Sequence, residues 1–200
     1  LSLRRQRQMC IRDRVYCFDL RNLGNSFHGL WESVLTVYAL ARSFGIAPKS
    51  IITNCSGFVP LAHRNQWVDE IKGVAFINDS KATNVDATIH ALRTLKNVHL
   101  ILGGRAKEDN FCQLQDSMKN ISRIYLIGEA AALIASNFQD QEIEQFDTLK
   151  DAFDSAISIA TQGDTILFSP ACASFDQYLN FEERGKHFIS LVKEYRKNII

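Results

Sequence analysis

The stretch Gly73-Val-Ala-Phe-Ile-Asn-Asp-Ser-Lys-Ala-Thr-Asn84 decides how this chain folds. Its first half is an apolar run, its second half is polar, and apolar residues at helical spacing follow from Val85. This order predicts a buried strand over 73–77, a short loop, and a helix near 84–95 that Thr83 or Asn84 caps. At such a junction the free backbone N–H groups and the positive helix end face the same crevice as the loop side chains. For this loop alone, a capped turn with solvated charges is the simpler alternative.

The same alternation of strand and helix continues to the end of the chain. We expect strands at 98–102, 123–127, 143–146 and 165–168, and helices at about 111–120, 129–137, 149–161 and 183–197. Continuously apolar strands, each followed by a helix, are typical of a parallel sheet covered on both faces. The fold class is therefore α/β, with a doubly wound, mostly parallel, Rossmann-like sheet.

A smaller piece precedes this domain. A strand signal over 15–20 is followed by a helix over 30–44, which Gly45 ends, and by the start of another short helix at 47. Residues 53–66 are rich in Asn, Ser, Gly, Pro and His and are predicted to be a linker. We place the domain boundary near Leu61, so that the main domain covers 61–200.

Charge is unevenly distributed along the chain. Residues 1–14 hold five arginines against one aspartate, whereas the rest has 18 Lys+Arg and 21 Asp+Glu. The opening 1–14 resembles translated adaptor sequence, and we expect a non-native leader; a basic nucleic-acid-binding arm is the alternative. The mildly acidic body gives no reason to expect a nucleic acid partner. No apolar run approaches the ~20 residues of a membrane helix, so no membrane partner is expected.

Cysteine and histidine are too scattered for a metal site. The five cysteines include no C-x-x-C pair, and no two of the five histidines lie at ligand spacing. We therefore assign no metal ligand, and the odd number of cysteines suits a reducing cytoplasm.

Polar loops follow three of the expected strands, at 78–84, 103–109 and 169–177. In open α/β sheets, ligands bind beyond the carboxyl ends of the strands, which meet at one edge. Lys81 and Lys107 supply compact positive charge there, and Ser174 supplies a neutral hydrogen-bonding group. These groups suit an anionic small molecule with more than one charged group. No Ser-His-Asp order or G-x-S-x-G elbow occurs, so no catalytic residue is assigned.

A complete nucleotide site is missing from the sequence. The nearest match to a phosphate-binding loop is Gly24–Gly29, but Leu30-Trp31 follow where Lys and Ser/Thr are needed. G-x-G-x-x-G is absent as well.

Four strings together resemble the Mur ligases, most closely the branch that adds D-glutamate. They are Asn78-Asp-Ser-Lys-Ala-Thr-Asn84, Leu102-Gly-Gly with Lys107, Ser169-Pro-Ala-Cys-Ala-Ser-Phe-Asp-Gln177, and Asn180-Phe-Glu-x-Arg-Gly185. The last is the most specific, because other Mur ligases and folylpolyglutamate synthases share the fold but not that string. The resemblance covers Leu23 to Tyr195. It implies a C-terminal acceptor-binding domain over 61–200 and the tail of a central ATP-binding domain with its linker over 15–60.

The resemblance implies ATP-dependent peptide-bond formation in bacterial peptidoglycan synthesis. The carboxylate of UDP-N-acetylmuramoyl-L-alanine becomes an acyl phosphate, the amine of D-glutamate attacks it, and phosphate leaves. The implied partners are these two substrates and ATP with Mg²⁺, in a cytoplasmic enzyme expected to be a monomer. In the family, the P-loop and the magnesium ligands lie upstream of the matched region, so this chain alone is expected to be inactive.

The family's binding residues can be transferred by matching position. Thr83 and Lys107 would hold the α-carboxylate of D-glutamate, and Ser174 and the backbone near Phe181 would hold its side-chain carboxylate. Arg64, Asp79 and Lys81 would face the nucleotide, with Arg64 reaching the ATP phosphates. One departure concerns adenine, because the family's His-Asn-x-x-Asn reads His28-Gly-Leu-Trp-Glu32 here.

Two other functions remain open: a non-catalytic α/β ligand-binding module, and a related ligase with a different acceptor amino acid. Single residues also have simpler interpretations. Lys107 could be a solvated loop lysine, Ser174 a helix cap, and Asp79 a loop cap. The side chain of Phe181 is expected to pack in the core, with its function in the amide. Cys172 is expected to be a small buried residue and not a nucleophile.

Overall fold

The computed structural model describes residues 6–11, 14–19, 31–55, 58–138 and 141–199. The chain divides into two compact units, Leu1–Leu61 and Ala62–Ile200. The described elements of the first unit are β1 (Gln6–Ile11), β2 (Arg14–Asp19), α1 (Trp31–Ser43) and α2 (Pro48–Cys55). Strands β1 and β2 form an antiparallel pair, so the segment expected to be a non-native leader contains a strand. The helices pack through a small apolar cluster that includes Tyr38 and Ile51. The family's adenine-contact string, 28–32, lies partly outside the described residues.

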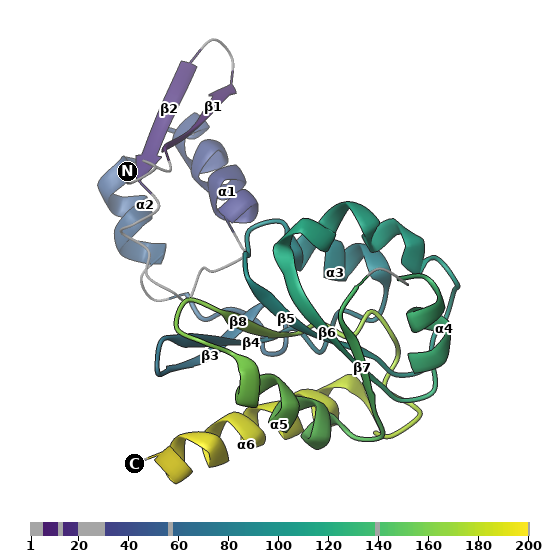
Figure 1. Cartoon of the computed structure of the whole chain (residues 1–200). Helices are drawn as coiled ribbons and strands as arrows, with labels where there is room; N and C mark the ends of the chain where they lie inside the picture. Colours follow the sequence, from purple (N-terminus) through teal and green to yellow (C-terminus); the bar gives the residue numbers. More distant parts are fainter. Residues whose placement is uncertain (1–5, 12–13, 20–30, 56–57, 139–140, 200) are drawn as a thin grey trace. The chain divides into compact units, whose positions relative to one another are not determined.

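The second unit is built on one sheet (Figure 1). Its described strands are β3 (Gln66–Ile71), β4 (Val74–Asn78), β5 (Val98–Gly103), β6 (Ile121–Ile127), β7 (Ile143–Phe146) and β8 (Thr165–Phe168). They lie in the order β3-β4-β8-β5-β6-β7. Only β3, at one edge of these strands, runs antiparallel to its neighbour; the other described pairs are parallel. The expected α/β fold with a doubly wound, mostly parallel sheet is confirmed.

Helices cover both faces of this sheet (Figure 1). One face packs against α3 (Val85–Leu92), the 3₁₀ helix η3 (Phe111–Asn120) and α4 (Ala131–Ser136). The other face packs against α5 (Leu149–Ile159) and α6 (Phe181–Ile199). This arrangement explains the continuously apolar strands, because side chains that point to either face of the sheet are buried.

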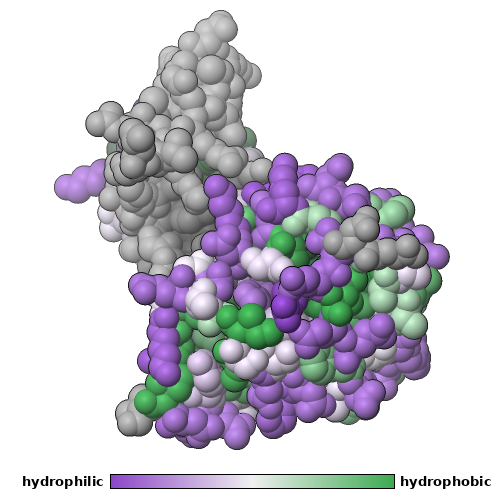
Figure 2. Space-filling view, in the orientation of Figure 1, coloured by the Kyte–Doolittle hydropathy of each residue, from purple (hydrophilic) through white to green (hydrophobic). Residues whose placement is uncertain are grey.

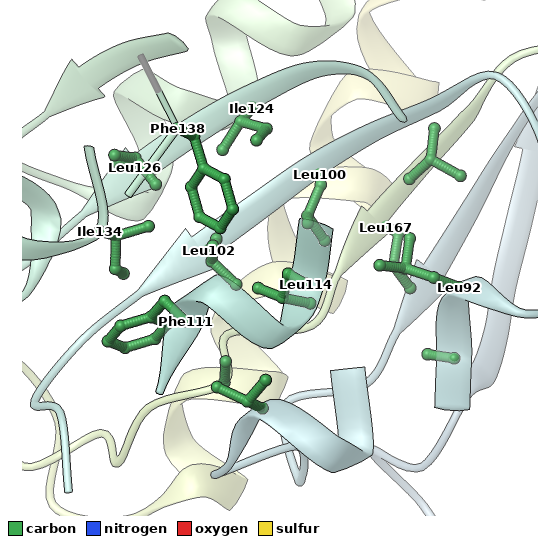
Figure 3. Packing of buried hydrophobic residues seen from close by; sticks show 14 of the residues in the cluster. Leu92, Leu100, Leu102, Phe111, Leu114, Ile124, Leu126, Ile134, Phe138 and Leu167 are labelled. Carbon is green, nitrogen blue, oxygen red and sulfur yellow. The ribbon is translucent and has the colours of Figure 1, made fainter. Parts of the chain in front are cut away.

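Strand β5 illustrates how the two cores form. Leu100 and Leu102 belong to the cluster under α3 and η3, whereas Ile101 between them belongs to the cluster under α5 and α6. Figure 3 shows Leu100 and Leu102 among Leu114, Phe138 and their neighbours. All three strand residues are fully buried, and each such side chain contributes about 1.5–3 kcal/mol to folding.

The structure adds to or corrects the expected local structure at three places. Strand β3 was not predicted, because its sequence Gln66-Trp-Val-Asp-Glu-Ile71 is mixed and mostly half-buried, as suits an edge strand. Residues 53–66 are not all linker, since α2 continues to Cys55. The helix expected at about 111–120 is present as a 3₁₀ helix, Phe111–Asn120. The apolar spacing does not distinguish a 3₁₀ helix from an α-helix well.

The strand register brings the carboxyl ends of the strands together. Asn78 and Ile101 both pair with Phe168, and Ile127 pairs with Gly103 and Phe146. The loops after β4, β5 and β8 therefore begin at the same edge.

The visible face of the second unit is mostly hydrophilic, with apolar patches divided by polar side chains (Figure 2). Within the described residues, no helix combines the length and apolar character needed to cross a membrane.

Candidate functional site

The loop after β4 is fixed by buried polar contacts. Asn84 caps α3, as predicted, by accepting a hydrogen bond from the N–H of Ala87 at 2.9 Å. The Asn78 amide nitrogen donates to the carbonyl of Gly185 at 3.1 Å and lies 2.9 Å from Nδ1 of His63. The loop therefore leaves β4 in a defined direction, and its remaining side chains are held at the edge of the sheet.

Thr83 and Lys107, the two residues assigned to one carboxylate, lie in direct contact. Lys107 Nζ is 3.5 Å from Thr83 Oγ1, although the two belong to different loops. Gly103, the last residue of β5, and Gly104 let the backbone turn so that Lys107 can approach Thr83. Gly104 has φ +130°, and a Cβ there would lie 2.4 Å from the carbonyl oxygen of Ala173.

Ser174 is joined to the Lys107 loop through the backbone. Arg105 and Ala173 exchange both N–H···O bonds at 2.9 Å, and these residues closely precede Lys107 and Ser174. Ser174 is only 2% exposed, and its carbonyl accepts from the N–H of Tyr178 at 2.8 Å. The loops after β5 and β8 therefore meet beside Lys107 and Ser174.

Phe181, the first residue of α6, faces the loop after β4. Its carbonyl accepts a hydrogen bond from the Ser80 hydroxyl at 2.8 Å, and its ring centroid lies 3.7 Å from Nζ of Lys81. The half-buried ring is also edge-on to His63, with centroids 6.3 Å apart. The expectation that this ring packs in the apolar core was wrong, because it is half-buried beneath a cation and belongs to neither apolar cluster of the sheet.

Arg64, which precedes β3, lies close enough to Asp79, the first residue after β4, for its charge to act on that carboxylate. Arg64 is exposed between two non-glycine residues of positive φ, His63 (64°) and Asn65 (41°). Asp79 accepts from the Asn65 N–H at 3.0 Å and from the Ser169 hydroxyl at 2.8 Å. Burial raises the pKa of Asp79 to about 6, although these bonds and the charge of Arg64 oppose the shift. Both carboxylate oxygens are thus engaged by the protein itself, which favours the loop-capping interpretation.

Arg184 is a central residue of this site that the sequence interpretation did not assign. It is 1% exposed and donates from Nη2 to the carbonyls of Ser80 and Cys172, at 2.9 and 3.0 Å. Desolvation lowers its pKa to about 10, and Nη1 has no hydrogen-bond partner within the described structure. Arg184 lies in the Asn180–Gly185 string that was recognised in the sequence. An arginine in a helix is normally solvated, however, and its burial is evident only from its contacts with Ser80 and Cys172 in the folded chain.

Gly185, the next residue of that string, has a steric role. A Cβ there would lie 2.3 Å from Nδ1 of His63. Cys172 is fully buried, and burial raises the pKa of its thiol to about 12, so the thiol stays protonated and is not a nucleophile.

A cavity of about 550 Å³ lies beside these loops but contains none of the predicted site residues. Its lining includes Glu129, Asp147 and Asp176 and no lysine or arginine. A ligand with two carboxylates would be repelled there, whereas Arg64, Lys81 and Lys107 are cations. The loop residues that carry these cations, called the loop site below, therefore suit an anion better than the cavity does. The donors of the loop site are ammonium groups, a hydroxyl and amides, which suit carboxylate or phosphate oxygens and not Mg²⁺. Across the described ranges, no cluster of three or more His, Cys, Asp or Glu could hold a metal ion.

Residues 63–172 match the protein family described as Mur ligase, glutamate ligase domain. The UDP-N-acetylmuramoylalanine–D-glutamate ligase of Dinoroseobacter shibae is 42% identical over 164 residues, covering 82% of this chain and 35% of the relative. The ligase of the same name from Koribacter versatilis is 41% identical over 165 residues, covering 82% and 36%. The chain thus spans about a third of the length of these curated relatives.

Solved structures share the fold at low identity. UDP-N-acetylmuramate–alanine ligase of Thermotoga maritima gives a TM-score of 0.60 at 14% identity, covering 92% of this chain and 40% of that one. A pseudomurein peptide ligase type C from Methanothermus fervidus gives 0.58 at 16% identity, covering 97% and 41%.

Proposed function

The chain belongs to the Mur ligase family through its glutamate ligase domain, and from this membership we propose that it is the acceptor-binding part of an ATP-dependent ligase. The reaction joins D-glutamate to UDP-N-acetylmuramoyl-L-alanine in peptidoglycan synthesis. The names of the relatives that are about 40% identical support this choice of acceptor. In this proposal residues 61–200 form the acceptor-binding domain, and 15–60 is the end of the central ATP-binding domain with its linker.

The contact between Lys107 and Thr83 is the observation that carries the proposal. The ammonium and hydroxyl are 3.5 Å apart, so a single carboxylate can accept hydrogen bonds from both. Each charge-assisted bond contributes about 1.5–3 kcal/mol. We assign the α-carboxylate of D-glutamate to this pair.

The side-chain carboxylate is assigned to Ser174 and the backbone N–H of Phe181. Phe181 begins α6, a helix of 19 residues, so its amide lies at the positive end of the helix dipole. The paired backbones of Arg105 and Ala173 support the assignment, because they join the loops that carry the two halves of the acceptor site.

Arg64 and Lys81 are assigned to the phosphate side of the reaction. Transfer of a phosphoryl group to a carboxylate and its later displacement by an amine both develop negative charge, which fixed cations stabilise. Asp79 belongs to the same side, where its bond to the Asn65 N–H supports the turn that presents Arg64. Mg²⁺ accompanies ATP in this chemistry. Because the donors described here suit anions, we assign the metal to parts of the ligase outside this chain.

A titration of the 15N-labelled chain with D-glutamate tests the acceptor site by NMR. We expect shifts at Thr83, Lys107, Ser174 and Phe181, weaker binding of D-aspartate, which is one methylene shorter, and no binding of L-lysine. Equal shifts with L-lysine would favour a different acceptor. Shifts confined to the acidic cavity would refute the assignment of D-glutamate to these loop residues.

A second assay separates a ligase from a non-catalytic module. In a chain extended to the length of its relatives, phosphate release from ATP should require both D-glutamate and UDP-N-acetylmuramoyl-L-alanine. D-Glutamate binding without any such turnover would support the module.

A further inference from the structure

The contact between Lys81 and Phe181 has properties that the acceptor site alone does not require. Lys81 Nζ lies 3.7 Å from the centroid of the Phe181 ring, well within the range of a cation–π interaction. Within the described structure, the Lys81 side chain forms no ion pair with a carboxylate. The lysine is therefore held by an aromatic face and not by a carboxylate.

The backbones on both sides of this contact are fixed. The Ser80 hydroxyl donates to the carbonyl of Phe181 at 2.8 Å, and the N–H of Lys81 donates to the carbonyl of His63 at 3.0 Å. Arg184, one turn along α6, donates from Nε to the Ser80 hydroxyl at 3.1 Å. These bonds hold the ring and the ammonium opposite each other through contacts within the chain itself, so the contact is built into the fold.

We propose that the side chain of Phe181 is a positioning group for Lys81, which it holds in place for an anionic oxygen of the phosphate side of the reaction. A carboxylate partner would also hold the lysine, but it would neutralise the charge and would have to be displaced by the substrate. An aromatic face attracts the ammonium through its quadrupole and leaves the charge in place.

Phe181 then serves both halves of the site. Its amide belongs to the acceptor side and its ring to the phosphate side, so one residue couples the two. This inference rests on the proposed function only for the identity of the anion; the contact itself does not depend on it.

NMR of the chain tests the contact directly. The ring current of Phe181 should shift the Cε protons of Lys81 upfield. Phe181→Leu, which keeps the backbone amide and carbonyl, should abolish this shift, and Phe181→Trp should retain it. If Phe181→Leu lowers the midpoint of unfolding, Phe181→Met serves as a second non-aromatic variant in the same test. A wild-type Lys81 signal at the position of a solvated lysine would overturn the proposal.

A titration with inorganic tripolyphosphate, followed at the Lys81 side chain, tests the role of the contact. We expect Phe181→Leu to bind about threefold to fivefold more weakly, which is the effect of losing one partly solvated cation–π interaction, and Phe181→Trp to bind like wild type. Equal affinity in Phe181→Leu, or no response of Lys81 in wild type, would overturn the role.

D-Glutamate separates this inference from the proposed function. Shifts at Thr83 and Lys107 should persist in Phe181→Leu, because the amide remains. If wild type shows the upfield Lys81 signal and the tripolyphosphate response but no D-glutamate binding, the proposed acceptor fails while the positioning role stands.

Discussion

The guanidinium of Arg184 donates to both oxygens of Ser80, to the carbonyl at 2.9 Å and to the hydroxyl at 3.1 Å. Together with the bond to Cys172, these contacts join the loops after β4 and β8 to the first turns of α6. The buried arginine thus connects the segments that carry Lys81, Ser174 and Phe181.

Arg184→Lys should destabilise the chain although it preserves the charge. A lysine cannot reproduce the fork of donors, so buried carbonyls of Ser80 and Cys172 would lose their partners. We expect a loss of about 3 kcal/mol in the free energy of unfolding, measured by urea titration. The exposed Arg93→Lys is the matched control and should stay within about 0.5 kcal/mol of wild type. An equally small effect at Arg184 would show that its bonds are not structural.

Gly185→Ala should be destabilising, against the usual preference of helices for alanine. The added Cβ would lie 2.3 Å from Nδ1 of His63, so the ring must move or the helix must shift. We expect a loss of about 1–3 kcal/mol by urea titration. In the background of His63→Ala the same change should cost much less, since the obstructing ring is gone. Additive losses in the double variant would contradict this steric explanation.

Asp79→Asn should stabilise the chain at neutral pH but not in acid. The folded pKa of about 6 exceeds the ordinary value of 3.8, so the folded state binds this proton more tightly than the unfolded state. The resulting contribution to stability is complete below the ordinary pKa and is lost as the pH rises through about 6. Asparagine stays neutral, so we expect a gain of about 1–3 kcal/mol in unfolding free energy near pH 7.5 that shrinks towards pH 4.5. The exposed Asp116→Asn controls for net charge. A gain of the same size at both pH values would disprove the assigned titration.

Lys107→Ala should impair the binding of D-glutamate more than any other step of the reaction. In the extended ligase we expect the KM for D-glutamate to rise about tenfold, which corresponds to ~1.4 kcal/mol of lost binding. Lys119→Ala, on the exposed side of η3, is the matched control and should leave that KM unchanged. If both variants behave like wild type, Lys107 does not belong to the acceptor site.

The periodicity of the sequence was sufficient for the parallel strands and the helices, because strands buried on both faces are continuously apolar. Strand β3 was missed because it lies at the edge of the sheet. An edge strand buries less of its surface, so its sequence lacks a clear apolar run. Position in the fold, and not composition, makes it a strand.

The candidate site was predictable where local sequence carries the chemistry. The loops after β4, β5 and β8 were recognised by their polar residues, and Thr83 and Lys107 are in contact. Arg184 and the ring of Phe181 were not recognised, because their roles depend on Ser80 and Lys81, which are distant in the chain. Pairings of this kind follow from the fold and leave no periodic signal.

The position of β8 determines when the sheet can be completed. This strand, made from residues 165–168, lies between β4 and β5, which are consecutive in the chain but are not hydrogen-bonded to each other. During synthesis, the β3–β4 hairpin and the β5–β6–β7 segment therefore remain unconnected, each with an unpaired strand edge. Backbone hydrogen bonds can join them only after β8 has been translated, so the acceptor site cannot assemble until most of the domain has left the ribosome.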